Sequence, residues 1–156
     1  MASCEQQIRF EHWANSQSLK ASHGLPEALS LVAHIVSISC FWAARVEGTA
    51  GNLDPWPTLT APELETELRQ LLDRWLRLSH CTAMDAQVGY VSSDGESRSN
   101  LFSEVLQEVL LHGAHHRGQI ALVLRMKGLE PPRSTDFIPA LRTKALQHPA
   151  PLREGV

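Results

Sequence analysis

The stretch LLHGAHHRGQIALVLRMKG, residues 110–128, decides the fold, because it joins the pattern of a long helix to residues that weaken helices. Its apolar residues recur at helical spacing, and the glycine and two prolines at and beyond its end stop the pattern. Yet it contains three histidines and two interior glycines, and each such glycine destabilises a helix by roughly 1 kcal/mol relative to alanine. We therefore expect this helix to bind a ligand or to pack closely against a neighbour.

His112 and His116 are the first candidate ligands. Residues four apart lie one turn apart on the same helix face, so two imidazoles at this spacing can point at one metal ion. Neutral imidazoles buried without a partner are poorly satisfied, and a metal would satisfy both. They also fall within an apolar stripe that predicts an inward-facing side: Val105, Val109, His112, His116, Ile120 and Val123.

His34 is a third candidate, on the apolar side of another predicted helix. Three histidines from two helices can bind Zn²⁺ or a similar divalent metal and leave a position open for water or substrate. The alternative is that His34 is a hydrogen-bonded core residue, and spacing alone does not decide between the two.

The other histidines have weaker patterns. His115 rivals His116 but lies about 100° around the helix from it, so we expect it to face a neighbouring helix, a subunit or solvent. His12 is a possible extra ligand or a residue of the surface or of a pocket lining. His23, His80 and His148 are expected near loops or the tail, in solvent.

The composition indicates one globular domain over residues 1–156, since 43% of the 156 residues are apolar and 20% are charged. A formal charge of −3 gives no general reason to bind nucleic acid or an anionic membrane. Cys4, Cys40 and Cys81 are odd in number and form no CxxC pair, which argues against a disulfide framework or a cysteine zinc knuckle and fits the cytoplasm. The uncharged run 28–44 is better explained by a buried amphipathic helix than by a membrane span.

Four helical segments are predicted, over residues 5–21, 27–47, 60–79 and 99–127. The stripe expected to be buried in the second comprises Leu31, His34, Ile38, Phe41 and Trp42. Thr60 with Glu63 predicts a capping box for the third, with Pro62 tolerated in its first turn.

Between the third and fourth helices, residues 86–100 change pattern, and Asp94-Gly95 is a hairpin turn signal. We expect an extended connection or a short hairpin there. A peripheral tail over 139–156 is expected to hold one short helix near 139–147. These elements predict an all-α fold, a four-helix bundle with one longer crossover, although an irregular all-α domain would show the same periodicity.

Several other sites find no support in the sequence. ExxH and HExxH are absent, which argues against helical di-iron and metalloprotease sites. CxxCH, GxGxxG and GxxxxGK are also absent, and no serine has an elbow motif.

Residues 112–138, HGAHHRGQIALVLRMKGLEPPRSTDFI, resemble the signature of the DinB-like family of metal-binding four-helix bundles. LVAHIVSISCFWAARVEG is similar to the family's histidine-containing second helix, and FEHWANSQSL resembles the opening of its first helix. The resemblance covers most of the chain in order.

The resemblance implies a three-histidine metal site at His34, His112 and His116, with zinc or nickel as the metal. It also implies a homodimer acting on a small molecule, either as a metal-dependent thiol S-transferase using a low-molecular-weight thiol or as a hydrolase. No side chain is identified as catalytic, and metal-bound water or thiolate would be the nucleophile. One alternative is a non-catalytic metal-binding or sensor module, or a stress-response binding module. Another is a bundle whose histidines are simply packed in the core.

Residues around the histidines have expected supporting roles. Arg117 and Gln119 are expected to bond to a neighbouring helix or subunit. Glu108, four residues before His112, is a candidate to orient an imidazole. Gly113 and Gly118 are expected to permit close approach by another helix or subunit.

Overall fold

The computed structural model describes residues 3–22, 24–49, 54–92, 94–143 and 146. This part of the chain is mostly helical, with one small sheet, as the all-α prediction requires. The elements, in chain order, are α1 (Cys4–Ser22), α2 (Pro26–Val46), α3 (Ala61–Cys81), β1 (Gln87–Val91), β2 (Ser97–Leu101), α4 (Phe102–Met126) and α5 (Phe137–Leu141).

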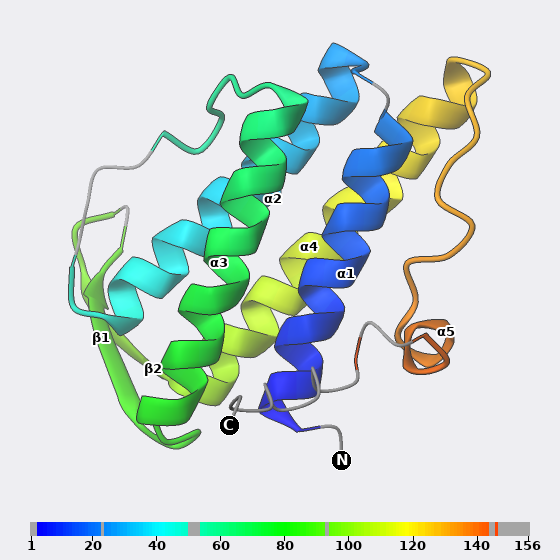
Figure 1. Ribbon diagram of the computed structural model, residues 1–156. Helices are drawn as coiled ribbons and strands as arrows, with labels where there is room; N and C mark the ends of the chain where they lie inside the picture. The colour runs from blue at the N-terminus through cyan, green and yellow to red at the C-terminus, as the bar shows by residue number, and fades with distance from the viewer. Residues whose placement is uncertain (1–2, 23, 50–53, 93, 144–145, 147–156) are drawn as a thin grey trace, which may run out of the picture.

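The four long helices lie alongside one another in two pairs (Figure 1). α2 packs most extensively against α4, and α1 packs against α3; the pairs then meet through α2 with α3 and α1 with α4. Burial of apolar side chains at these contacts is the main stabilising term. The largest fully buried apolar residues come from α2, α3 and α4: Val32, Ile35, Leu64, Phe102, Val105, Ile120 and Leu124.

The predicted start of α3 is confirmed. The Glu63 carboxylate accepts hydrogen bonds from the Thr60 backbone N–H at 2.7 Å and from its hydroxyl at 2.6 Å. Pro62 lies in the first turn, where its missing N–H is not needed. The buried residues of α3 recur at helical spacing: Leu64, Leu68, Leu71, Trp75 and Leu78.

The predicted start of α4 at Ser99 or Asn100 is wrong, because both residues belong to β2. Asn100 pairs with Val88, and Ser99 pairs with Gly89, in an antiparallel ladder with β1. α4 begins at Phe102, where the Glu104 carboxylate accepts the N–H of Leu101 at 2.9 Å. The strand therefore runs directly into the helix.

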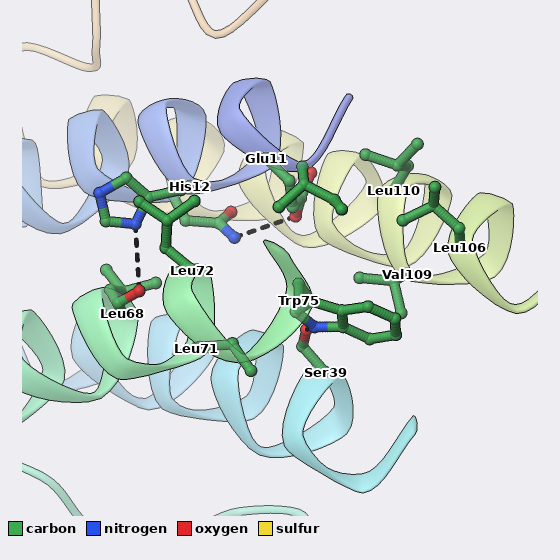
Figure 2. Close-up of a pocket in the computed structure, with 12 residues that line it drawn as sticks. Glu11, His12, Ser39, Leu68, Leu71, Leu72, Trp75, Leu106, Val109 and Leu110 are labelled. Atoms are coloured by element: carbon green, nitrogen blue, oxygen red, sulfur yellow. Dashed lines mark hydrogen bonds between the residues drawn. The ribbon is translucent and has the colours of Figure 1, made fainter. Parts of the chain in front are cut away.

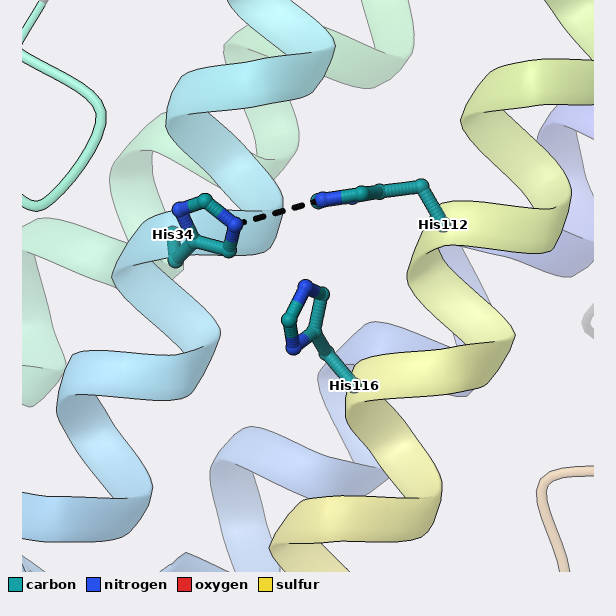
Figure 3. Close-up of side chains that lie close together, drawn as sticks. All are labelled: His34, His112 and His116. Atoms are coloured by element: carbon teal, nitrogen blue, oxygen red, sulfur yellow. Dashed lines mark hydrogen bonds between the residues drawn. The ribbon is translucent and has the colours of Figure 1, made fainter.

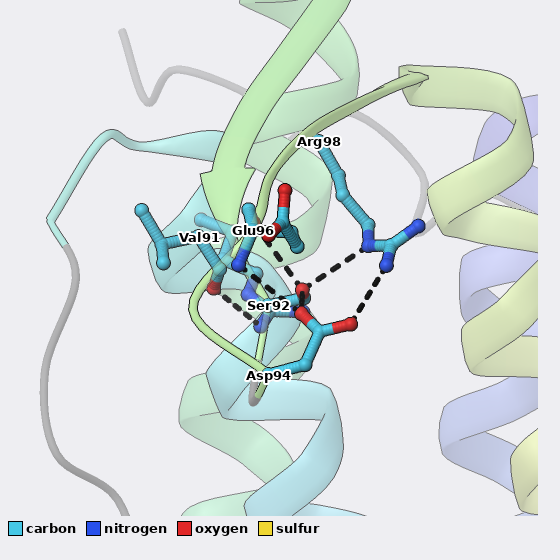
Figure 4. Close-up of polar contacts among 6 residues, drawn as sticks. Val91, Ser92, Asp94, Glu96 and Arg98 are labelled. Carbon is cyan, nitrogen blue, oxygen red and sulfur yellow. Dashed lines mark hydrogen bonds and ion pairs between the residues drawn. The ribbon is translucent and has the colours of Figure 1, made fainter.

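The connection between α3 and α4 is the short hairpin that the Asp94-Gly95 signal predicted (Figure 4). Gly95 has φ 84°, a left-handed conformation that glycine adopts without strain. The Asp94 carboxylate accepts hydrogen bonds from the Glu96 N–H at 3.1 Å, from Arg98 at 2.7 Å and from the Ser92 hydroxyl. These bonds close the turn with local polar groups.

The stripe predicted for α2 is only partly correct. His34 is buried, but Leu31, Ile38, Phe41 and Trp42 are only partly buried. The buried face is shifted around the helix because α2 contacts three helices and buries more than one narrow stripe. Its buried apolar residues are Ala28, Val32, Ala33, Ile35, Val36, Ala43 and Ala44.

α2 also has the length and apolar composition to cross a membrane, with a mean hydropathy of 1.6 over its most apolar window. Half of that window is buried inside the structure. The core helix of a globular protein can have the same length and apolar composition. Its contacts with α4, α3 and α1 agree with the prediction of a buried helix.

The tail departs from its prediction. The short helix α5 lies at Phe137–Leu141, earlier and shorter than the expected 139–147, and most of the later residues lie outside the described part of the chain. Phe137 stacks edge-on against Phe10 of α1, with ring centroids 5.1 Å apart. As predicted, a glycine ends α4: the helix runs to Met126, and Gly128 just beyond it has φ 72°.

Candidate metal centre

Three histidines converge between α2 and α4 (Figure 3). His34 projects from α2, while His112 and His116 project from successive turns of α4, as their spacing predicted. His34 and His116 are each 9% exposed, and His112 is half-buried. The sequence-predicted trio is therefore brought together by the packing of two helices that are far apart in the chain.

The imidazole nitrogens are close enough to share one ion. One ligand nitrogen from each of the three residues lies within 4.8 Å of the others. The Nε2 atoms of His34 and His112 are 3.2 Å apart. Two nitrogens bound to one tetrahedral zinc, each at about 2.0–2.1 Å, lie about 3.3 Å apart. The donor set and its spacing thus fit a divalent metal.

The tautomer of His34 is set by the loop that follows α2. Its Nδ1 lies 2.7 Å from the carbonyl oxygen of Pro55. Because a carbonyl only accepts, Nδ1 carries the proton, and Nε2 of the neutral ring presents a lone pair to the cluster. The bond between the two Nε2 atoms then requires His112 to donate, and a metal ion would take the place of that proton.

His116 is held in the same tautomer by Gln119. Its Nδ1 donates to the Gln119 amide oxygen at 2.7 Å, so its Nε2 is left as a lone-pair donor toward a metal. The amide nitrogen of Gln119 in turn donates to Nε2 of His115 at 3.1 Å. Metal-binding histidines in proteins usually have their second nitrogen fixed in this way.

Burial and the repulsion between neighbouring imidazoles favour the neutral forms of His112 and His116. Burial lowers the pKa of His112 to about 4, with smaller contributions from the positive charge that His116, His34 and His115 would carry. Burial also lowers the pKa of His116, although its hydrogen bond to Gln119 opposes the change. Neutral imidazoles are the form that binds metal, so the site is ready for an ion at neutral pH.

A short loop covers one side of the cluster. Trp56 stacks on His34, with ring centroids 3.8 Å apart and planes 7° apart, yet 49% of Trp56 is exposed. The Ser37 hydroxyl donates to the carbonyl of Asp54 at 2.5 Å and ties the same loop to α2. The sequence did not predict these roles of Pro55 and Trp56, since a carbonyl acceptor in a loop leaves no residue-type signal.

The supporting residues differ in how well they match their predictions. Arg117 bonds to a neighbouring helix as expected, but Gln119 bonds within α4, to His116 and His115, so its predicted partner is wrong. Glu108 is exposed, and no hydrogen bond joins it to His112 among the described residues, so its predicted orienting role is not found.

Of the remaining histidines, only His115 adjoins the cluster among the described residues: its ring lies edge-on to His116, with centroids 4.9 Å apart, and its Nε2 faces Gln119 instead of the three converging nitrogens. His12 is turned toward α3, where its Nδ1 lies 3.1 Å from the carbonyl oxygen of Leu68, so it is not an extra ligand (Figure 2). His115 and His80 are exposed, as expected. The predictions for His23 and His148 fall outside the described residues.

A buried ion pair supports the ligand-bearing turn of α4 from its other side. Arg117 donates to the Glu11 carboxylate at 2.8 Å and to the Asn15 amide oxygen at 2.7 Å. Asn15 also donates to Glu11 at 2.9 Å, beside a cavity of about 20 Å³ (Figure 2). Burial raises the pKa of Glu11, and Arg117 opposes that change.

The two glycines of the ligand helix have different surroundings. A Cβ at Gly113 would lie 1.9 Å from the Glu11 carboxylate, so this glycine permits the close approach that was predicted. A Cβ at Gly118 would meet nothing within 4 Å, so the predicted packing of a helix there is not found within the described part of the chain. Packing of a subunit at Gly118 stays a prediction.

Comparison with known proteins identifies one protein family. Neither a curated protein nor a solved structure matches the chain significantly. The model of the DinB family matches residues 4–142, which include all four long helices and the three clustered histidines. The chain therefore belongs to the DinB family.

Proposed function

We propose that this protein binds one divalent metal ion through His34, His112 and His116. The observation that carries the proposal is the convergence of three imidazole nitrogens within 4.8 Å of one another. The hydrogen bonds from His34 to Pro55 and from His116 to Gln119 leave the Nε2 atoms of these two rings free of protons. Zinc and nickel both suit a set of imidazole ligands.

We propose that the bound metal serves an enzyme that acts on a small molecule, as a thiol S-transferase or a hydrolase. A divalent metal with three protein ligands keeps a position open and lowers the pKa of water or a thiol that binds there. The chain's own contribution is to orient the imidazoles, through the hydrogen bonds of His34 to Pro55 and of His116 to Gln119. A low-molecular-weight thiol is the proposed co-substrate of the transferase.

We further propose that the chain forms a single four-helix-bundle domain that works in the cytoplasm. The contacts among α1, α2, α3 and α4 support a four-helix bundle of the DinB type, formed by one domain over residues 1–156. The free cysteines Cys4, Cys40 and Cys81 suit the reducing cytoplasm.

We propose a homodimer through one exposed face of α4. The face has apolar side chains at helical spacing, of which Leu111 is 59% exposed, Leu122 57% and Met126 77%. Gly118 lies between them with open space around it. A second copy of α4 would cover this apolar stripe and approach closely at the glycine.

Metal analysis tests the proposal. Wild-type protein and the variants His112→Ala and His80→Ala would be loaded with Zn²⁺ or Ni²⁺, desalted and analysed for bound metal. We expect one ion per chain in wild type, a large loss in His112→Ala and no change in His80→Ala, because His80 is exposed near the end of α3 and is not part of the cluster. Equal metal content in all three proteins would refute the site.

Turnover separates an enzyme from the alternative, a metal-binding or sensor module. Thiols paired with electrophilic acceptors, and a panel of hydrolysable esters and amides, would be assayed with the metal-loaded protein and again with a chelator. We expect at least one reaction whose rate falls when the metal is removed and in His112→Ala. Rates at background across both panels would favour the non-catalytic module.

A further inference from the structure

Trp56 occupies an unusual place for a large aromatic residue. Its indole stacks on the His34 ring at 3.8 Å and lies edge-on to the His116 ring, with centroids 6.3 Å apart. At the same time 49% of the residue is exposed. The side chain thus lies between the histidine cluster and solvent and contacts both.

The loop that carries Trp56 is anchored independently of the indole. The His34 Nδ1–H donates to Pro55, and the Ser37 hydroxyl donates to the carbonyl of Asp54. The Asp54 carboxylate also accepts the N–H of Trp56 at 2.9 Å. These three bonds fix the backbone of residues 54–56 at the edge of the site. The loop therefore holds its position without needing the indole to be buried.

Stabilisation of the fold accounts poorly for such a residue. Trp75 shows what a structural tryptophan looks like here: it is 4% exposed, and its indole N–H donates to Ser39 at 2.9 Å. Trp56 leaves about half of its surface in water, where an aromatic side chain gains little from burial. An exposed aromatic at the rim of a site instead suits recognition of a ligand.

We infer that Trp56 is a specificity-determining residue, whose indole forms a wall against which a flat, π-conjugated part of the substrate packs. The inference rests on the proposed metal function, because the substrate's reacting atom would sit at the open position of the metal. The ring or conjugated group attached to that atom would lie along the exposed indole.

Charge decides between the two kinds of group that an indole attracts. Indole rings bind flat π-systems and also cations. The three imidazole ligands are uncharged, so a divalent ion would leave a net positive charge beside the indole. A cationic group there would be repelled, whereas a neutral or anionic aromatic group would not. The structure therefore favours an aromatic or heteroaromatic substrate.

Three hydroxamates test the inference, because each chelates a metal through the same two oxygens and differs only in the attached group. Acetohydroxamate carries a methyl group, benzohydroxamate a flat ring and cyclohexanecarbohydroxamate a saturated ring of similar size. Binding would be followed by the visible spectrum of Co²⁺-loaded protein. The proteins would be wild type, Trp56→Leu, Trp56→Phe and, as a control at a tryptophan that packs on Tyr90 of the hairpin, Trp42→Leu.

We expect wild type to bind benzohydroxamate about fivefold more tightly than the cyclohexane analogue, in line with the usual strength of aromatic pairs. Trp56→Leu should lose most of this preference, while Trp56→Phe and Trp42→Leu should keep most of it. Acetohydroxamate should bind all four proteins alike. A preference that is the same in wild type and Trp56→Leu would overturn the inference and leave the metal proposal intact.

Failure of the metal proposal gives a different result. If no Co²⁺ binds, or acetohydroxamate leaves the spectrum of wild type unchanged, the open metal site itself is refuted. Should Trp56→Leu lose its metal, nuclear Overhauser effects in the Zn²⁺-loaded wild type decide. Contacts between the Trp56 indole protons and the phenyl protons of benzohydroxamate are expected, and their absence would overturn the inference.

Discussion

The carboxylate of Glu11 fills the space that a side chain at Gly113 would need, with Oε1 only 1.9 Å from the position of a Cβ. The same oxygen accepts the hydrogen bond of Arg117 at 2.8 Å. Gly113→Ala should therefore displace a buried ion pair and destabilise the protein by at least about 2 kcal/mol. Urea denaturation measures the change.

Gly118→Ala is the matched control, since its Cβ would meet nothing within 4 Å. Both variants are compared in the Leu122→Glu background, which keeps the proposed dimer contact at Gly118 out of the comparison. Alanine is the better helix former, so there Gly118→Ala should be unchanged or more stable, by up to about 1 kcal/mol. Equal stability changes in the two variants would show that helix propensity, and not the Glu11 contact, governs position 113.

Acid should destabilise the metal-free protein through its buried histidines. Burial lowers the pKa of His112 to about 4 and also lowers that of His116 and His12, so the unfolded chain takes up protons at a higher pH than the folded one. Their contribution to stability is complete above about pH 6.5 and is lost as the pH falls toward 4. Denaturation at a series of pH values measures the loss.

The contribution of His112 to the pH dependence of stability can be isolated by comparing wild type with a His112 variant. Burial raises the pKa of Glu11, so this group acts in the opposite sense and loses stability as the pH rises. Comparing wild type with His112→Gln removes the effect of Glu11, which both proteins share. The variant should lose less stability than wild type between pH 6.5 and pH 4, and parallel profiles would contradict the prediction.

Gln119 should matter for metal affinity although it is not a proposed ligand. Gln119→Leu removes the acceptor of the His116 Nδ1–H, so the ring is no longer held in one tautomer and orientation. We expect Zn²⁺ binding about tenfold weaker, measured by competition with a chelating dye. Gln107→Leu, at an exposed position of the same helix, should bind as wild type does; equal losses in both would remove the orienting role.

The proposed dimer predicts a mass in solution close to twice the 17.3 kDa of the chain. Leu122→Glu places a charge in the exposed apolar face of α4 and should give a monomer in sedimentation equilibrium. Val91→Glu, at a 62% exposed position of the hairpin, should remain a dimer. A wild-type monomer, or a dimer unaffected by Leu122→Glu, would exclude this interface.

Much of the fold could be predicted because its signals are local. Capping by Glu63, the glycine at 128 and the Asp94-Gly95 turn each act within a few residues, and all three have the predicted structure. The start of α4 could not be predicted, because Ser99 and Asn100 are drawn into a strand by pairing with β1. The buried face of α2 depends on which helices surround it, which its own periodicity does not reveal.

In the candidate site, too, the features set by local spacing could be predicted, and those set by tertiary packing could not. His112 and His116 share a helix face by spacing alone, so their meeting could be predicted. His34 joins them only because α2 packs against α4. The contacts with Pro55, Trp56 and Gln119 depend on a loop path and on side-chain rotamers, which no spacing rule describes.

The attachment of the hairpin to α4 limits where the chain can tolerate insertions. The N–H groups of Phe102 and Ser103 donate to the carbonyls of Ala86 and Met84, each at 2.9 Å, so the base of the hairpin fixes where the helix starts. An extra residue in the exposed turn beyond Val91 leaves that start in place. An extra residue after Ser103 would rotate the rest of the helix by about 100° and carry its two histidines away from α2. Length variation among related sequences should therefore occur at the turn and be absent from the first turns of α4.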